Sequence, residues 1–196
     1  MRRDNPMALF GKWLADAERA EPTNPNAATL ATIGGDGMPQ ARTILVKEHG
    51  AGGFVFFTNR ESRKGLALRE CAKAALAFYW KPLGRQVLAE GETRELPRAR
   101  VAKYFRTRPR QSQIGAWASR QSQPIPDYAE LAAAVKTLDA KYRGKLPPLP
   151  PHWSGFCLRP IRMEFWLEGG GRLHQRLAFW RDKDGGSGWK SALLQP

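Results

Sequence analysis

Two guanidinium groups and an imidazole alternate near the C-terminal end of the chain, at Arg172, His174 and Arg176. Alternate residues of a strand share one face, so this spacing predicts that the three side chains lie together, with Leu173 and Gln175 on the opposite face. Such a face suits an anionic or electron-rich planar ligand, because guanidinium groups stack on rings and donate through a fixed fork. A solvated, charged edge strand is an equally good interpretation of the spacing.

A second pair of cations, Arg42 and Lys47, lies five residues apart in a mostly apolar segment. Ideal alternation sends the two side chains to opposite faces of a strand. If both cations are functional, either the strand lies between two anionic groups or Lys47 lies at the end of the strand, where alternation lapses. Otherwise both cations are exposed ends of a buried strand. Spacing alone slightly favours the last alternative. Further on, the segment 62–64 (Ser-Arg-Lys) combines a hydroxyl, two cations and helix-start N–H donors, which is how phosphates are commonly held.

Six cations and no acidic residue occur between Arg98 and Arg110. Within this run, Tyr104 and Arg108 are spaced to share a helical face. One interpretation is that Tyr104, Arg108 and a nearby hydroxyl such as Ser112 bind the same phosphate. Another is that the run forms a basic stripe that binds nucleic acid. A solvated helix face is the third interpretation.

Hydrolytic chemistry has little support in the sequence. It contains no Gly-rich phosphate loop, no persuasive carboxylate pair and no Ser-His-Asp order beyond chance. The three histidines are scattered and the two cysteines form no C-x-x-C pair, so we expect no metal. Hydride chemistry supplied by a cofactor fits these residues better.

The length of 196 residues suits one domain with its own core. A formal net charge of +14, from 32 Lys and Arg against 18 Asp and Glu, concentrates anions at the surface and favours phosphorylated partners. The longest apolar run, 74–80, is too short to cross a bilayer, and the first residues lead into a helix pattern rather than an export signal. We therefore expect a cytoplasmic protein that spans no membrane.

The periodicity of apolar residues changes from helical to alternating early in the chain. Asn5 and Pro6 are a typical N-cap and first helical residue, and they predict a helix over 6–20. Alternating segments separated by Gly-rich turns then predict an antiparallel meander. Its expected strands are 28–33, 40–47, 54–58, 74–79 and 86–92, with a short helix from Ser62 to Cys71 after the third.

The second half of the chain is expected to begin with helices and end with strands. The expected elements are helices at 98–107 and 127–142, an irregular segment at 109–126 between them, and strands at 153–158, 162–167, 172–181 and 189–193. Short, hairpin-connected strands leave open edges unless their sheet closes. We therefore predict a mainly β fold with peripheral helices: one domain over 1–196, an antiparallel barrel with strands at about 28–92 and 153–194, and a helical insert at about 98–142.

Two long blocks, Arg108 to Trp117 and Arg172 to Arg176, are highly specific in type and order. Shorter blocks accompany them along nearly the whole chain, at 42–47, 57–59, 62–64, 85–87, 103–105, 121–122 and 164–166. Together these segments resemble the pyridoxine (pyridoxamine) 5′-phosphate oxidase family.

The resemblance implies a homodimer of FMN-binding split β-barrels, with each flavin at the subunit interface. It also implies oxidation of pyridoxamine or pyridoxine 5′-phosphate to pyridoxal 5′-phosphate, with O2 reoxidising the flavin and releasing H2O2. The residues implied in FMN binding are Arg42, Thr43, Ile44, Leu45, Val46, Lys47, Phe57, Thr58, Arg63, Lys64, Gln86, Gln121, Ser122, Trp166 and Arg176. The residues implied in binding the substrate phosphate are Lys47, Tyr104, Arg108 and Ser112, while Arg172 and His174 would frame the pyridine ring as the catalytic pair.

Two alternatives to this function stay open on the sequence. A related split-barrel flavin oxidase could act on another aromatic metabolite, such as a phenazine precursor, because Gln175 and Leu193 replace the family's usual Asp and Arg. A basic nucleic-acid-binding barrel would instead use the 98–110 run. It would need aromatic residues on exposed strands, whereas the Phe-rich runs of this chain are typical of a core.

Overall fold

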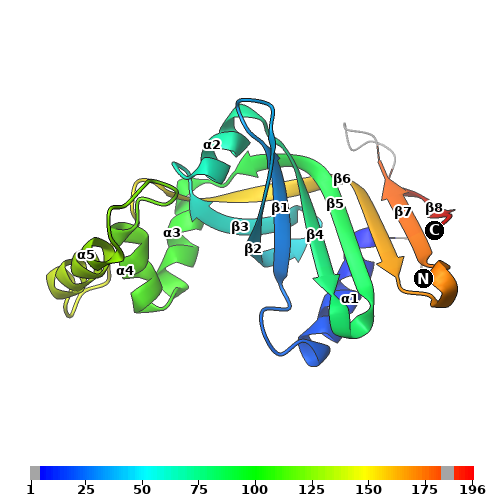
Figure 1. Cartoon of the computed structure of the whole chain (residues 1–196), viewed down its shortest axis with the longest axis horizontal. Coiled ribbons are helices and arrows are strands. Elements are labelled where there is room, and N and C mark those ends of the chain that lie inside the picture. The colour runs from blue at the N-terminus through cyan, green and yellow to red at the C-terminus, as the bar shows by residue number, and fades with distance from the viewer. Residues whose placement is uncertain (1–4, 182–187) are drawn as a thin grey trace.

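The structure is a computed structural model that describes residues 5–181 and 188–196. Within these residues, eight strands form one sheet in the order β3-β2-β1-β4-β5-β6-β7-β8 (Figure 1). The strands are β1 (Ala27–Ile33), β2 (Pro39–Gly50), β3 (Gly53–Asn59), β4 (Lys73–Trp80), β5 (Arg85–Glu95), β6 (Trp153–Leu167), β7 (Gln175–Trp180) and β8 (Lys190–Leu194).

A pairing between β3 and β6 closes the first six strands of that order into a barrel. Every neighbouring pair is antiparallel. Closure gives both outer strands of the six a partner, which removes the open edges that made a flat sheet unfavourable. The predicted fold class, mainly β with an antiparallel barrel and peripheral helices, is confirmed.

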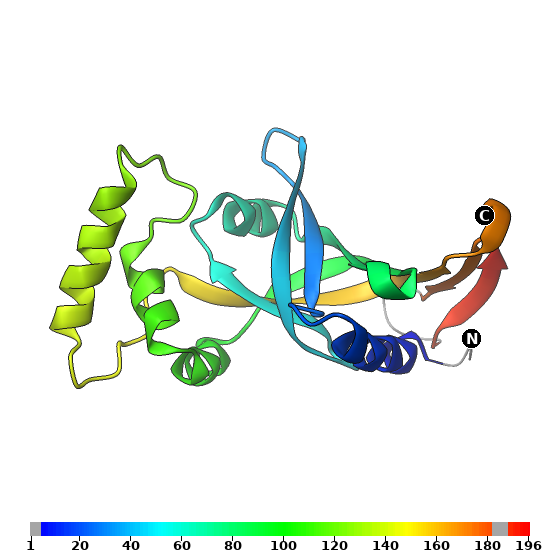
Figure 2. The ribbon, with the colours of Figure 1, turned by 60° about the horizontal axis from the view of Figure 1, so that its bottom comes forward.

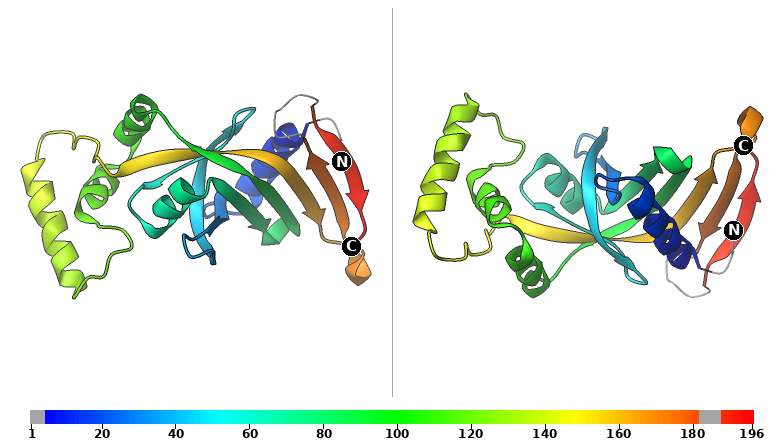
Figure 3. Two further views of the ribbon diagram at one scale, coloured as in Figure 1. Left: turned by 90° about the horizontal axis from the view of Figure 1, so that it is seen from above. Right: turned by 90° about the horizontal axis from the view of Figure 1, so that it is seen from below.

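The prediction of separate strands at 153–158 and 162–167 is wrong, because β6 runs through both. Its first part pairs with β3 and its second part pairs with β7, while β5 follows it along most of its length (Figure 3). The apparent break contains Pro160, which cannot donate to the ladder. Pro160 lies opposite Gly91 at a register shift in the β5–β6 pairing, where a bulge accommodates the missing donor.

The helices lie around the barrel and extend one end of it. They are α1 (Pro6–Ala20), α2 (Arg63–Glu70), α3 (Arg98–Thr107), α4 (Arg110–Ala118) and α5 (Tyr128–Lys141), with short 3-10 turns η1 (Lys81–Leu83) and η2 (Gly170–Arg172). Helices α3, α4 and α5 gather at one end, and β7 and β8 lie at the opposite end (Figures 1 and 2). Among the described residues, no helix combines the length and apolar character that a membrane span requires.

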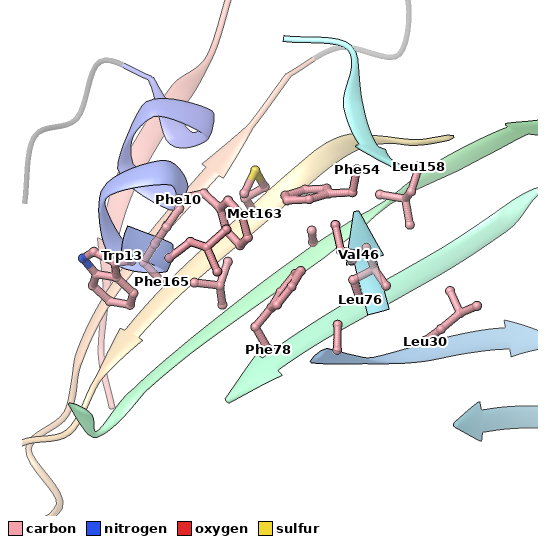
Figure 4. Packing of buried hydrophobic residues seen from close by; sticks show 14 of the residues in the cluster. Phe10, Trp13, Leu30, Val46, Phe54, Leu76, Phe78, Leu158, Met163 and Phe165 are labelled. Carbon is pink, nitrogen blue, oxygen red and sulfur yellow. The ribbon is translucent and has the colours of Figure 1, made fainter. Parts of the chain in front are cut away.

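Helix α1 begins where the sequence predicts, because the Asn5 side chain accepts hydrogen bonds from the backbone N–H groups of Met7 and Ala8. Its apolar stripe is buried against the barrel. Phe10 is fully buried and makes edge-to-face contacts with Phe54 and Phe78, as Figure 4 shows. The helix therefore covers one opening of the barrel core.

Helix α4 occupies part of the segment predicted to be irregular, so that prediction is wrong for residues 110–118. Its sequence carries little apolar periodicity, and a tertiary contact defines it. The buried Gln113 amide donates to the backbone carbonyls of Phe105 and Arg108 at the end of α3, at 2.9 and 3.1 Å. These bonds add a side-chain donor to carbonyls at the end of α3, and they fix α4 against α3.

The strand predicted at 172–181 begins only at Gln175. Arg172 belongs to the 3-10 turn η2 and has a φ of 65°, and Leu173 follows it as the C-cap. The alternation argument that placed Arg172, His174 and Arg176 on one strand face is therefore wrong. The pair Gly170-Gly171 accounts for the difference, because Gly171 also adopts a left-handed conformation and turns the chain before the strand starts.

Truncating Phe10 tests whether α1 is needed to seal the core. Phe10→Ala should lower the free energy of unfolding by about 3–5 kcal/mol, because it leaves a cavity among fully buried rings. Met38→Ala, at a side chain that is 61% exposed, is the control and should change stability by less than about 0.5 kcal/mol. Urea unfolding at a fixed protein concentration measures both, and equal losses would contradict this role of α1.

Candidate functional site

A cavity of about 470 Å³ opens between β2, β3, the first residue of β6, and helices α2 to α4. It collects residues that are far apart in the sequence. The predicted site residues that line it are Thr43, Ile44, Leu45, Lys47, Phe57, Thr58, Lys64, Tyr104, Arg108, Ser112 and Gln121. The predicted contact Val46 instead buries its side chain in the hydrophobic core.

One side of the cavity is built on the start of α2. Ser62 caps this helix by accepting from the N–H of Gly65, as the sequence predicts. The Lys64 ammonium donates to the Gln121 side-chain oxygen at 3.3 Å, and the Thr58 hydroxyl donates to the same oxygen at 3.3 Å. The Arg63 N–H donates to the Ser122 hydroxyl at 3.2 Å. The loop after α4 is thereby held against the helix start, next to backbone donors and two cations.

The cations on this side lie close to one another. Burial lowers the pKa of Lys64, and the nearby Arg42 guanidinium lowers it further. Burial and then Arg63 lower the pKa of Arg42 in the same way. Arg42 itself is held by the Thr32 hydroxyl at 2.7 Å and by the Leu30 carbonyl at 3.2 Å, neither of which neutralises its charge. A bound anion would relieve this repulsion.

The other side of the cavity holds Lys47, Tyr104, Arg108 and Ser112. Burial lowers the pKa of Arg108, and burial together with the Arg108 charge lowers the pKa of Lys47. Burial raises the pKa of Tyr104, so its hydroxyl stays protonated and can donate. Arg108 Nη1 is buried and has no hydrogen-bond partner among the described residues. A buried donor in this state is suited to an anionic ligand.

A bulge explains how Lys47 reaches the cavity. The pairing of β2 with β3 shifts register between Val46 and Glu48, so strand alternation lapses at Lys47. The spacing left open that alternation lapses at Lys47 because the strand ends there, but β2 continues to Gly50 and the lapse is a bulge within it. Tyr104 and Arg108 do not share a helical face as predicted, because α3 ends at Thr107 and Arg108 is its extended C-cap. They still meet in the cavity, because the chain turns there into α4.

The remaining predicted residues lie at the other end of the sheet. Gln86, Trp166 and Arg176 are direct cross-strand neighbours on β5, β6 and β7. The ring centroids of Trp166 and His174 lie 4.6 Å apart, and Arg172 belongs to the turn between these two residues in the chain. Figure 1 places β7 on the far side of the barrel from α3 and α4. The chain therefore carries two separate groups of predicted site residues.

Arg176 differs from the cations of the cavity because it has an acidic partner. Its Nε and Nη2 donate to the two carboxylate oxygens of Glu164 at 2.8 and 3.0 Å. This bidentate pair raises the pKa of Arg176. The guanidinium is fixed in orientation with Nη1 directed to the Gln195 carbonyl at 3.1 Å.

Some cavity residues had no role assigned from the sequence, namely Asn59, Gly115, Ala116, Ser119 and Trp153. Asn59, Gly115 and Ala116 lie inside the blocks that carried the resemblance, so their position in those blocks was an available signal. Trp153 carried only the signal of an aromatic residue that follows the proline-rich connector.

The basic run from Arg98 to Arg110 is not a continuous stripe. Arg98 donates to backbone carbonyls at the start of β6, Arg100 forms an ion pair with a glutamate of β2, and Arg110 forms one with an aspartate of α5. Arg108 lies in the cavity. Three of the six cations have partners within the fold and Arg108 lies in the cavity, which leaves Lys103 and Arg106 exposed without the others. The run therefore supports a discrete anion site better than a surface that follows a nucleic acid backbone.

Family models match two adjoining parts of the chain: residues 14–142 as pyridoxamine 5′-phosphate oxidase, and residues 153–196 as the pyridoxine 5′-phosphate oxidase C-terminal dimerisation region. The chain belongs to the pyridoxine/pyridoxamine 5′-phosphate oxidase family. The oxidase of this name from Azorhizobium caulinodans is 49% identical over 193 residues, which cover 98% of this chain and 91% of the relative. That of Anaeromyxobacter dehalogenans is 48% identical, with 98% and 96% covered.

Solved structures of the oxidase family and its relatives share the fold. PhzG from Burkholderia lata, in complex with tetrahydrophenazine-1-carboxylic acid, superposes with a TM-score of 0.92 at 34% identity, covering 100% of this chain and 94% of that one. A pyridoxamine 5′-phosphate oxidase-related, FMN-binding protein from Nostoc punctiforme has a TM-score of 0.79 at 14% identity, with 98% of both chains covered. The second likeness is one of fold alone.

Inorganic phosphate should stabilise the protein, and the effect should weaken in alkaline solution. The pKa values of Lys47 and Lys64 are lowered in the free cavity, and a bound anion favours their charged forms, so binding takes up protons. The rise in Tm with phosphate should therefore be largest below the lowered lysine pKa values and fall as pH rises through them. Thermal unfolding across an alkaline pH series measures this.

Lys64→Met should reduce the phosphate-induced rise in Tm, while Lys73→Met is the control at an exposed lysine of β4, away from this cavity. A rise in Tm that did not depend on pH, or that was unchanged in Lys64→Met, would contradict anion binding by these lysines.

Proposed function

We propose that the protein oxidises pyridoxamine 5′-phosphate, pyridoxine 5′-phosphate or both to pyridoxal 5′-phosphate, with FMN as cofactor and O2 as electron acceptor. The observation that carries the proposal is the group Lys47, Tyr104, Arg108 and Ser112, which gathers donors and unneutralised charge at one side of the cavity. A phosphate ester supplies the anion that this group lacks. The names of relatives 45–49% identical to this chain support the same reaction.

The other side of the cavity fits the phosphate of FMN. Arg63 and Lys64 stand at the start of α2, Arg42 lies beside them, and Gln121 and Ser122 join the loop after α4 to this group. The helix start adds backbone donors that favour an anion. When bound, FMN would supply the redox chemistry, namely acceptance of a hydride from the substrate carbon and transfer of the electrons to O2 to give H2O2. For the amine, the whole reaction consumes water and O2 and releases ammonia and H2O2 with the aldehyde.

The far group consists of the predicted residues at the other end of the sheet, Gln86, Trp166, Arg172, His174 and Arg176. In our proposal, the far group of a second copy of the chain completes the site. Gln86, Trp166 and Arg176 would contact the flavin held in the partner's cavity, and Arg172 and His174 would frame the substrate ring. The match of residues 153–196 to a dimerisation region supports a homodimer. An isologous interface then forms two identical composite sites. In such a dimer, the two groups of one chain serve different sites, so they need to lie apart.

Positioning is the main task of the side chains in this mechanism. The substrate phosphate is anchored by Lys47, Tyr104, Arg108 and Ser112. Arg172 and His174 fix the substrate ring, so that the carbon to be oxidised faces the flavin. Strands and helices line the cavity and partly bury its cations, which strengthens the charge interactions inside it. The free thiols of Cys71 and Cys157 agree with a reducing, cytoplasmic location.

The alternative is oxidation of a phenazine precursor, which the likeness to PhzG favours. The ligand named in that complex is a carboxylic acid, whereas this cavity offers two cations, a phenol and a serine hydroxyl at one side. Four such groups match the three terminal oxygens of a phosphate ester better than the two of a carboxylate. We therefore retain the vitamin B6 5′-phosphates as substrates.

Variants on the two sides of the cavity should separate cofactor loss from substrate loss. Arg63→Ala or Lys64→Ala should weaken FMN retention by about 1.5–3 kcal/mol, because each removes a charge-assisted partner of a phosphate. Arg108→Ala should leave the purified protein yellow and raise the apparent KM for pyridoxamine 5′-phosphate. Absorbance of bound flavin and H2O2 release measure the two effects, and equal flavin loss in all three variants would refute the division.

Mixing two inactive variants tests the composite site. Arg108→Ala impairs the cavity and His174→Ala impairs the far group, so each homodimer should lose kcat/KM while keeping its fold. After random subunit exchange in an equal mixture, one site in each heterodimer is intact, and about a quarter of wild-type activity should return. The control experiment uses Gln175→Ala in place of His174→Ala. The Gln175→Ala homodimer should be active before any mixing. Recovery no greater than the mean of the two variants would place both groups in the same subunit.

A further inference from the structure

The Arg108 side chain is held by aromatic rings instead of an acidic partner. Its guanidinium carbon lies 4.7 Å from the centroid of the Trp153 ring and 5.9 Å from that of Phe105. Nη1 is buried and has no hydrogen-bond partner among the described residues. Burial is the largest influence on the pKa of Arg108 and lowers it, while Tyr104 partly offsets the effect. The charge therefore remains available to a ligand.

The backbone of Arg108 does not by itself orient this side chain. Arg108 is the first residue after α3 and is extended, with a φ of −71° and a ψ of 148°. Its carbonyl is fixed by the Gln113 amide at 3.1 Å, but the long side chain beyond it has several rotatable bonds. The broad face of Trp153 is the nearer of the two ring surfaces against which it rests.

Trp153 is itself rigidly placed. Arg98 donates to its backbone carbonyl at 2.6 Å, and the β3–β6 register sets it opposite Asn59. Its ring is 4° from parallel with Phe57 and 2° from parallel with Tyr104, at centroid distances of 5.4 and 6.2 Å. The side chain is only 6% exposed and lines the cavity.

On the basis of the function proposed above, we propose that Trp153 is the positioning residue that aims the Arg108 guanidinium at the substrate phosphate. An aromatic face attracts a cation without consuming its N–H donors or cancelling its charge. A carboxylate would do both, as Glu164 does to Arg176 at the other end of the sheet. The indole thus lowers the freedom of the guanidinium and leaves its charge without an acidic partner at the cavity.

The test compares phosphorylated and unphosphorylated substrates in the FMN-loaded dimer. Trp153→Leu should raise KM for pyridoxamine 5′-phosphate by about 3- to 30-fold, because a partly buried cation–π contact of this kind is lost. It should leave kcat and the FMN content nearly unchanged, and it should not raise KM for pyridoxamine, which has no phosphate. Trp153→Phe keeps an aromatic face and should lie between wild type and Trp153→Leu.

The chain offers a matched control in Trp13, which is also 6% exposed and has the Arg85 guanidinium carbon 4.8 Å from its ring, away from the cavity. Trp13→Leu should cost stability without changing KM for the 5′-phosphate. In an Arg108→Met background, Trp153→Leu should add little, because the two changes remove the same contact. An unchanged KM in Trp153→Leu, an equal rise for both substrates, or an equal rise in Trp13→Leu would overturn the role of Trp153.

Calorimetry with inorganic phosphate separates this role from the proposed reaction. If wild type does not oxidise pyridoxamine 5′-phosphate, the proposed function fails, and a 3- to 30-fold weaker phosphate affinity in Trp153→Leu would still support the positioning role. If wild type oxidises the substrate and both Trp153 variants bind phosphate as wild type does, the proposed function stands and the role of Trp153 is refuted.

Discussion

The pairing of β3 with the first part of β6 is the constraint on which the rest of the structure depends. It closes the barrel, and it brings the end of β3, with Thr58 and Asn59, beside Trp153 at the cavity. The pairing is close: a Cβ added to Gly155 would lie 2.7 Å from the Phe57 ring. A larger residue at Gly155 would displace the ring that packs against Tyr104 at 3.9 Å. One ladder of hydrogen bonds therefore supports both the core and the aromatic wall of the site.

The same strand also separates the two groups of predicted site residues. Beyond Pro160, β6 no longer pairs with β3 and pairs with β7 instead. Trp166 on β6 and Arg176 on β7 therefore lie away from the cavity. A rigid strand cannot fold back to unite the two groups within one chain. In the proposed homodimer, association of two copies would bring the two groups together, so the order of the sheet would set the geometry of the site.

Charge is treated differently at the two ends of the protein. Lys47 and Lys64 in the cavity, and Arg42 beside Lys64, have lowered pKa values because burial and like charges disfavour protonation. At the far end, Arg176 is neutralised and oriented by Glu164. Left-handed backbone conformations occur at both places, with a φ of 74° at Ser122 and 65° at Arg172, at a cost of roughly 1–3 kcal/mol each. Strain and repulsion thus coincide with the residues proposed to bind ligand, which is where a folded protein can best tolerate them.

Local sequence signals determined most of the elements and the residue types of the site. The Asn5 cap, the alternating strands of the meander and the Ser62 cap act over a few neighbours, so periodicity and capping rules predict them. The resemblance supplied most of the cavity residues by order and type. Tertiary structure alone decided that β6 is continuous, that α4 is helical through Gln113, and that Arg172 precedes the strand in a turn. It also decided that Lys47 leaves strand alternation and that Trp153 faces Arg108. The continuity of β6, the position of Lys47 and the contact of Trp153 with Arg108 depend on strand pairing and on contacts between elements. Helix α4 and the Arg172 turn depend on a side-chain hydrogen bond and on glycine conformations nearby in the chain, and apolar periodicity does not encode these either.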